Sequence, residues 1–475
     1  VLAFFLAGLA AGSLCGGRFA VRLERPLQTF LTLQCVLLGY AGFALVVLVN
    51  LPTTTPFFSG LVEYWGAYRG FQLGAATNWE WILKLYVGLP LFLYGLPTFL
   101  MGLSFCVLQR AVQDDVRTSG FKVGALQAAN IGGNVAGSLL TGIFLLSWTG
   151  TAGSFRFLLF LGFGFAALGI FWYGFRGRFG ALAAVLLVVA FVAPSQVELW
   201  QRLHGAPEGG QTFIEEDGTG VAVISPDGGR KRLSVNGKGH SWLPFGNMHS
   251  VLGALPAALH AAPVDVAIVG LGSGDTAWAA GFRPETRRVV VFEVVAPERS
   301  LLEQVASPAL PDLQRFLADP RLDFRVADGR NALLHEDVSY DLIEADALRP
   351  TSAYSGNVYS VEFFELAAKR LKPGGVMCTW APTPRIRAAF MHVFPHVLEF
   401  QQGRVLLGSR DPIEVAETDW QQRLGTSAAR DYLGPQLIEQ VKLVAGTAGD
   451  ATELPGKEVP ANRDLFPRDE FLNED

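Results

Sequence analysis

The chain has 475 residues, of which 50% are hydrophobic and only 17% are charged, and its formal net charge is −5. A soluble globular domain carries roughly 25% charged residues, so this composition excludes a disordered chain and a wholly soluble enzyme. The acidic balance also argues against nucleic acid as a partner, because nucleic-acid binders usually present a basic face.

The charged residues are unevenly distributed along the chain. Residues 1–197 hold long apolar runs, whereas residues 198–475 have an ordinary charge density. We therefore expect a helical region in the lipid bilayer over 1–197, followed by a water-soluble part.

Six segments of the first region are apolar enough to be membrane spans, since a crossing helix needs about 20 mostly apolar residues. The first begins at Val1 with no basic segment before it, which indicates the end of a span whose start is missing. The other five are predicted at about 28–50, 85–108, 124–147, 154–173 and 179–197.

Glycines recur at four-residue spacing in two of these segments, at Gly8, Gly12 and Gly16 and again at Gly133 and Gly137. Small residues at this spacing let helix backbones approach closely in lipid. The spacing predicts helix packing within the chain, with a homo-oligomer seam as the alternative. The polar Gln127, Asn130 and Asn134 are expected to form hydrogen bonds between helices.

The water-soluble part opens with a small β region over 198–248. Short apolar runs are separated there by Asp227-Gly228-Gly229 and by Asn236-Gly237, which favour hairpin turns.

Helices and strands alternate from residue 249 to about 410, which predicts a doubly wound, Rossmann-like parallel sheet. A polar extension, 411–475, follows without assigned chemistry, and its stretch Val444–Glu458 is predicted to be a loop. The five strands are expected at Val264–Val269, Val289–Phe292, Phe324–Ala327, Leu342–Ala345 and Val376–Trp380.

Glycines and acids follow these strands directly, where ligands of such sheets bind. Gly270, Gly272, Ser273 and Gly274 form a loop after the first strand, and Glu293 ends the second. A carboxylate there can accept the hydroxyls of a ribose. Asp328-Gly329 follows the third strand and Asp346 the fourth. These residues predict a nucleoside pocket.

Asp275 stands where a dinucleotide-binding loop has its third glycine. This favours an S-adenosyl sulfonium over NAD as the ligand. The cysteines, Cys15, Cys35, Cys106 and Cys378, show no metal-ligand spacing, so no metal is expected.

The sequence resembles the spermidine synthase (polyamine aminopropyltransferase) family, which has a class I methyltransferase-like fold. It is most similar to bacterial proteins that fuse several membrane spans to such a domain. The stretches that carry the resemblance are 5–13, 96–102, Val235–Gly239, Gly270–Gly274, Asp328–Asn331 and Val358–Phe364.

The resemblance implies a transferase of polyamine biosynthesis in a bacterial inner membrane. Its donor would be decarboxylated S-adenosylmethionine, or S-adenosylmethionine itself, and its acceptor a small amine. The glycine loop, Glu293 and Asp328 with Gly329 would hold the donor. Asp346 would be the catalytic acid, because a carboxylate can orient an ammonium group and take its proton.

The sequence departs from the family in the half of the site that holds the amine. Arg349 stands where the family has a second acid, and Met248-His249-Ser250 replaces a Tyr-His-Glu motif. His240 replaces a glutamine. The candidate substrate-binding residues are His249, Arg349 and Tyr354.

Two other functions are open: a methyltransferase of similar fold, and a membrane transport or sensor protein whose nucleoside domain does not catalyse. The membrane side is open too. Loops 17–27, 109–123 and 174–178 carry more basic residues than the opposite loops, which places 198–475 outside the cell. An S-adenosyl donor, however, is a cytoplasmic metabolite.

Overall fold

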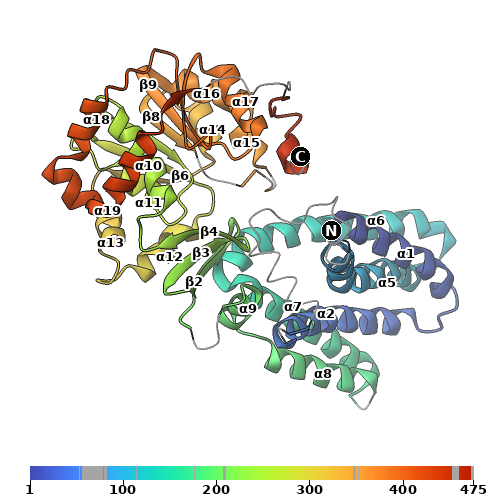
Figure 1. Cartoon of the computed structure of the whole chain (residues 1–475). Coiled ribbons are helices and arrows are strands. Elements are labelled where there is room, and N and C mark those ends of the chain that lie inside the picture. The colour runs from blue at the N-terminus through green and yellow to red at the C-terminus, as the bar shows by residue number, and fades with distance from the viewer. Residues whose placement is uncertain are drawn as a thin grey trace. The chain divides into compact units, whose positions relative to one another are not determined.

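The computed structural model describes residues 1–471 except 53, 56–78, 80–82, 114, 176, 207–209, 346–348, 351, 353 and 452–458. The chain divides into two compact units, Val1–Gly218 and Thr219–Asp475. Each is described by itself (Figure 1).

The described residues of the first unit are helical apart from connecting segments and one strand at the end of the unit. Its helices are α1 (Leu2–Ala20), α2 (Pro26–Asn50), η2 (Leu83–Gly88), η3 (Leu91–Gly95), α5 (Leu96–Val112), η4 (Val116–Thr118), α6 (Ser119–Leu139), η5 (Leu140–Leu145), α7 (Leu146–Tyr173), α8 (Arg178–Val192) and α9 (Gln196–Leu203). The strand is β1 (Phe213–Asp217).

Four helical stretches among the described residues are long and apolar enough to cross a membrane, or five if α8 and α9, which are bent by 69° to one another, form one span. The sequence predicted six. The difference arises because the segments 124–147 and 154–173 form one stretch, Ser119–Tyr173, of 55 residues. Gly150, with φ 63° and ψ −172°, breaks the helical geometry within this stretch, between the two predicted segments.

The first glycine repeat packs α1 against α5 within the chain. A Cβ atom on Gly12 would lie 2.0 Å from the carbonyl oxygen of Phe99, and one on Gly8 would lie 2.0 Å from Thr98 Oγ1. Only glycine allows this approach, so this repeat serves packing inside the chain. Around Gly133 and Gly137 no described atom lies within 4 Å of an added Cβ, and an oligomer seam there stays a prediction.

The second unit contains a sheet of eight strands in the order β12-β10-β11-β9-β8-β5-β6-β7. Strands β9 to β7 of this order are parallel, as predicted. The strands are β5 (Asp265–Val269), β6 (Arg288–Glu293), β7 (Leu322–Val326), β8 (Tyr340–Ala345), β9 (Leu371–Trp380), β10 (His396–Phe400), β11 (Val405–Ser409) and β12 (Gly449–Asp450). An antiparallel group, β2 (Gly220–Asp227), β3 (Arg230–Val235) and β4 (Lys238–Leu243), precedes them.

Helices cover both faces of the large sheet (Figure 1). Alternate residues of β5 point to opposite faces: Ala267 and Val269 join an apolar core with the aromatic rings of Phe364 and Phe390. The helices are α10 (Met248–Leu259), α11 (Asp275–Ala280), α12 (Pro297–Val305), α13 (Pro311–Leu317), α14 (Gly329–His335), α15 (Gly356–Tyr359), α16 (Val361–Arg370), α17 (Pro384–Val393), α18 (Glu417–Leu424), α19 (Ser427–Ala445) and α20 (Arg468–Phe471).

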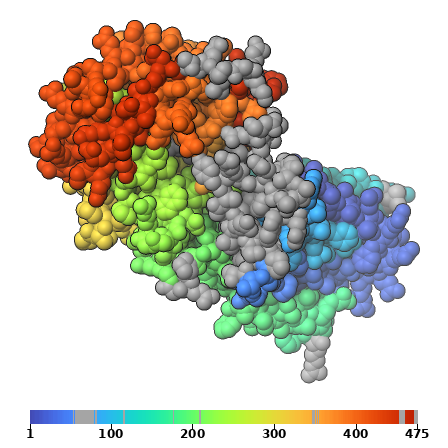
Figure 2. Space-filling model, in the orientation of Figure 1, coloured from blue at the N-terminus to red at the C-terminus, as the bar shows by residue number. Residues whose placement is uncertain are grey.

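The polar extension belongs to this fold. In Figure 2 the orange-red atoms of the extension are continuous with the surface of the rest of the second unit. Tyr432 of α19 stacks on Trp278 at 5.4 Å between ring centroids and donates a hydrogen bond to its carbonyl oxygen. The loop prediction for Val444–Glu458 is wrong at its start, where α19 continues to Ala445 and β12 follows; residues 452–458 lie outside the described part.

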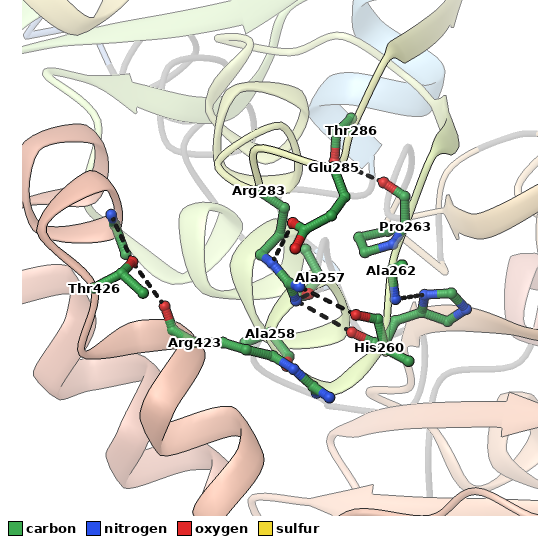
Figure 3. Close-up of polar contacts among 12 residues, drawn as sticks. Ala257, Ala258, His260, Ala262, Pro263, Arg283, Glu285, Thr286, Arg423 and Thr426 are labelled. Carbon is green, nitrogen blue, oxygen red and sulfur yellow. Dashed lines mark hydrogen bonds and ion pairs between the residues drawn. The ribbon is translucent and has the colours of Figure 1, made fainter.

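Two arginines close the carboxyl end of α10 (Figure 3). The guanidinium of Arg283 donates to the carbonyl oxygens of Ala257, His260 and Ala261, and Arg423 of α18 donates to those of Ala258 and Leu259. The last carbonyl groups of a helix lack partners within the helix and attract cations. The extension therefore fixes α10, whose first turn contains His249.

Candidate active site

The predicted nucleoside residues meet at one edge of the large sheet. Val269 is paired with Phe292 and with Ala345, and Glu293 is paired with Val326. The residues that follow these strands, including Gly270 and Asp328, therefore lie at the same carboxyl edge. The strand order reverses between β5 and β8, and such a switch point is where open sheets of this kind bind ligands.

The backbone of the glycine loop has a conformation that residues other than glycine adopt only with strain. Gly270, Gly272 and Gly274 have φ values of 99°, 52° and 89°. A Cβ atom on Gly274 would also lie 2.6 Å from the ring of Phe316. The three glycines allow a tight turn between β5 and α11.

Glu293 is buried beside this loop, with 6% of its surface exposed. Its carboxylate accepts hydrogen bonds from the N–H groups of Leu271 (2.8 Å) and Val295 (2.7 Å). Burial raises the pKa of Glu293, and the backbone hydrogen bonds oppose that shift. A carboxylate has about four lone-pair sites, so Glu293 can still accept from a ribose hydroxyl.

A second buried acid, Glu298 of α12, lies against the glycine loop and was not among the residues predicted from the sequence. Glu298 is 3% exposed and accepts a hydrogen bond from the N–H of Gly272. Its Oε2 atom has no hydrogen-bond partner among the described residues. Burial, together with the charge of Glu293, raises the pKa of Glu298 well above its usual value.

The two acids define which ligands suit the loop. The N–H groups of Leu271 and Gly272 donate to carboxylates, whereas a loop that binds a phosphate directs such groups at the anion. A phosphate at this loop would meet two carboxyl groups. These two N–H groups of the loop are therefore bound to carboxyl groups of the chain and are not directed at an anion.

Glu298→Gln is expected to make the protein increasingly more stable than the wild type as the pH rises above 4.5, the ordinary pKa of the group. In the folded protein the carboxyl keeps its proton to higher pH than in the unfolded chain, so folding loses about 1.4 kcal/mol for each pH unit between the two pKa values. Glutamine does not titrate and avoids that loss.

Thermal unfolding of the whole chain in detergent, from about pH 5 to about pH 8, measures this difference. Glu303→Gln is the matched control, since Glu303 lies on the same helix with an exposed side chain. Unfolding temperatures of Glu298→Gln that run parallel to those of the wild type would contradict the assignment of a buried, protonated Glu298.

The other predicted donor residues lie as follows. Ser273 is fully buried, and its hydroxyl donates to Asp275 at 2.9 Å. Asp328 accepts from the N–H of Asn331 and caps α14, and the side chain is exposed. Gly329 packs beneath it, where a Cβ would lie 2.9 Å from Val269. The predicted catalytic residue, Asp346, lies outside the described residues.

The start of α10 and strand β4 border the glycine loop. Ser241 of β4 accepts a hydrogen bond from the N–H of Ser273 at 2.9 Å. The carbonyl oxygen of His249 accepts from Thr276, which follows the loop. The backbone of His249 thus lies close to the glycine loop, and a role of this residue in substrate binding stays a prediction.

The remaining substrate-binding candidates differ in position. Arg349 is half-buried and donates from Nη2 to the carbonyl oxygen of Gly239 at 2.6 Å, so it joins the group around β4. Tyr354 has 75% of its surface exposed and a φ of 67°, and the described contacts do not bring it to the loop. Among the described residues, no three His, Cys, Asp or Glu side chains are grouped as metal ligands.

Part of this sheet is similar in sequence to known proteins. The family model for the spermine/spermidine synthase domain matches residues 247–396. A polyamine aminopropyltransferase of Nitrosomonas europaea is 29% identical over 195 residues, which cover 37% of this chain and 58% of that protein. Putrescine N-methyltransferase 3 of Nicotiana tabacum is 26% identical over 189 residues, or 39% of this chain and 45% of that protein.

A crystal structure of spermidine synthase in complex with the transition-state analogue AdoDATO is also similar. It is 18% identical, with a TM-score of 0.39, and the match covers 48% of this chain and 87% of that chain. The chain spans less than two thirds of the length of the curated relatives described above. Residues 247–396 of this chain are thus similar in sequence to a spermine/spermidine synthase domain.

Proposed function

We propose that the chain is a membrane-anchored, spermidine synthase-like transferase, which moves an aminopropyl group from an S-adenosyl-type donor to an amine. The main observation behind this proposal is the glycine loop at the switch point of the sheet. The carboxyl groups of Glu293 and Glu298 accept hydrogen bonds from the N–H groups of this loop. The carboxylate of Glu293 can accept ribose hydroxyls and favours a sulfonium cation electrostatically.

The residues assigned to the donor follow from this arrangement. The loop Gly270–Gly274 lets the backbone approach the nucleoside, Glu293 accepts from the ribose, and Asp328 lies on the adenine side. Decarboxylated S-adenosylmethionine supplies the electrophilic carbon next to its sulfur. The match of residues 247–396 to the spermine/spermidine synthase domain supports this donor.

Asp346 is assigned to the acceptor. It directly follows β8 in the sequence. Its carboxylate would orient the amine and accept the proton that the ammonium loses before it can attack. The remaining task of the site is to hold two molecules in line.

A second function, methyl transfer, has one specific observation in its favour. The proteins similar to this chain include one named as a putrescine N-methyltransferase. The same donor loop would then bind S-adenosylmethionine, and the methyl carbon would be attacked.

The membrane anchor rests on the four or five apolar helical stretches of the first unit. They are long enough for a bilayer core of about 30 Å, and we assign them to the inner membrane of a bacterium. The side on which residues 198–475 lie is not assigned.

The nucleoside product separates the two transfers. The whole chain, in detergent, is given S-adenosylmethionine or its decarboxylated form together with a mixture of amines, and products are identified by mass spectrometry. Methylthioadenosine that forms only with amine present supports aminopropyl transfer. S-adenosylhomocysteine would replace this proposal with methyl transfer, and intact donors in every mixture would leave a binding role.

A further inference from the structure

Strand β4 contains a bulge close to the glycine loop, Gly270–Gly274. Leu233 of β3 pairs with Ser241 and Ser234 pairs with Gly239, so His240 has no partner across the ladder. A bulge interrupts the alternation of side chains. As a result Lys238 and Ser241, three positions apart, lie on the same face of the hairpin.

The face of the hairpin that contains Lys238 and Ser241 is turned to the glycine loop. Ser241 Oγ accepts from the N–H of Ser273 at 2.9 Å, and a Cβ atom on Gly272 would lie 3.4 Å from the same oxygen. The bulge therefore directs Lys238 to the side of the hairpin where the donor is expected.

Basic side chains from β4, from the segment after β8 and from α10 lie close to this face of the hairpin. Arg349, from the segment after β8, reaches the backbone of β4 at Gly239. Burial, with Arg349 as a second cause, lowers the pKa of Lys238 to about 8. Burial, Arg349 and His249 together lower the pKa of His240 to about 4, so His240 is neutral at pH 7 while Lys238 and Arg349 keep most or all of their charge.

This charge is the reverse of what a polyamine needs. A polyamine brings two or more positive charges, and like charges about 4 Å apart repel by several kcal/mol near a protein surface. A carboxylate, in contrast, is bound well by the forked N–H groups of an arginine and by a lysine.

We propose that the acceptor is an amine that also carries a carboxylate, and that Lys238 and Arg349 bind this carboxylate. The proposal rests on the proposed function, since it names the acceptor of that same transfer. Lys238 and Arg349 also interact with other groups of the chain, and the proposal depends on their charge and position.

The step itself is a simple displacement. The lone pair of the acceptor nitrogen forms a bond to the methylene carbon beside the sulfonium, and the carbon–sulfur bond breaks. The sulfur keeps the electron pair and becomes a neutral thioether in methylthioadenosine. The nitrogen releases one proton to a carboxylate of the site or to water.

Matched acceptors test the proposal. The whole chain in detergent is given decarboxylated S-adenosylmethionine with either putrescine or γ-aminobutyrate, which share a four-carbon chain and differ only in one terminal group. The value of kcat/KM is expected to be at least about tenfold higher for γ-aminobutyrate, because a charge-assisted hydrogen bond gained or lost changes binding by about that much.

Two variants separate charge recognition from a structural role. Lys238→Gln is expected to lower kcat/KM for γ-aminobutyrate about tenfold, mainly through KM. Arg349→Glu is expected to reverse the preference so that putrescine becomes the better acceptor, a change that simple loss of structure would not produce. Lys231→Gln on β3 is the control for removing one positive charge from the same hairpin.

Failure of this inference can be distinguished from failure of the proposed function. Efficient transfer to putrescine in the wild type, with no gain for γ-aminobutyrate, would overturn this inference and leave the proposed function standing. The same loss of activity toward both acceptors in Arg349→Glu would also overturn it. Absence of methylthioadenosine with every amine would overturn the proposed function, and this inference with it.

Discussion

Asp346→Asn is expected to lower the rate of aminopropyl transfer by about a hundredfold to ten-thousandfold, the usual contribution of a general base. Asparagine has nearly the same shape but cannot take a proton from the acceptor ammonium. Binding of the donor should stay within about threefold of the wild type, because the acid is assigned to the acceptor.

The measurement is single-turnover formation of methylthioadenosine, with donor affinity determined separately by calorimetry. Asp337→Asn is the matched control: Asp337 lies at the surface, where its side chain pairs with Arg370, and the same chemical change there should leave the rate unaltered. A rate for Asp346→Asn close to that of the wild type would remove Asp346 from the chemistry.

Glu293→Gln is expected to weaken donor binding about tenfold to a hundredfold, since hydrogen bonds to a charged group contribute about 1.5 to 3 kcal/mol. Leu271 and Val295 donate to different oxygens of the carboxylate, so the NH2 of the amide would face one of these two N–H groups and that hydrogen bond would be lost. The loop would lose the geometry that faces the ribose as well as the negative charge.

Equilibrium binding of decarboxylated S-adenosylmethionine to the whole chain checks this prediction. Glu303→Gln again serves as the control, because Glu303 is a half-exposed partner of Arg299. Equal donor affinity in Glu293→Gln and the wild type would show that the ribose is held elsewhere.

Much of the sheet could be predicted because its strands are short, nearly continuous apolar runs. Val289–Phe292 and Leu342–Ala345 were placed correctly within β6 and β8, since a parallel strand buried on both faces has few polar residues. The glycines and Glu293 were found for a related reason: they follow such strands directly.

Glu298 could not be identified in the same way. An acid after a proline at the start of a helix is ordinary, because acids favour the helix amino terminus. Its burial depends on how α12 approaches the glycine loop, and that approach is a tertiary contact that no local pattern shows.

The longest helix of the extension, α19, has a sequence pattern from which it could have been predicted. Leu433, Leu437, Val441 and Val444 recur at helical spacing and are buried, although the polar residues between them dominate the composition. Gly434 and Pro435 interrupt the helical pattern within α19.

Two of the predicted membrane segments, 124–147 and 154–173, lie in one helical stretch of 55 residues. Gly150 falls between two predicted segments, and the helix geometry is broken there, yet the helix continues directly on either side. Sequence hydropathy located the change but could not show that no connecting loop separates the two halves.

The central claim, transfer of an aminopropyl group by this chain, is tested most directly by following the group itself. The donor is decarboxylated S-adenosylmethionine with ¹³C in its aminopropyl carbons, and the acceptors are γ-aminobutyrate and putrescine. The account predicts that the label appears in the acceptor, bound to its nitrogen, in amounts equal to the methylthioadenosine released. Label that stays in the donor, or that is released without joining an acceptor, would contradict it.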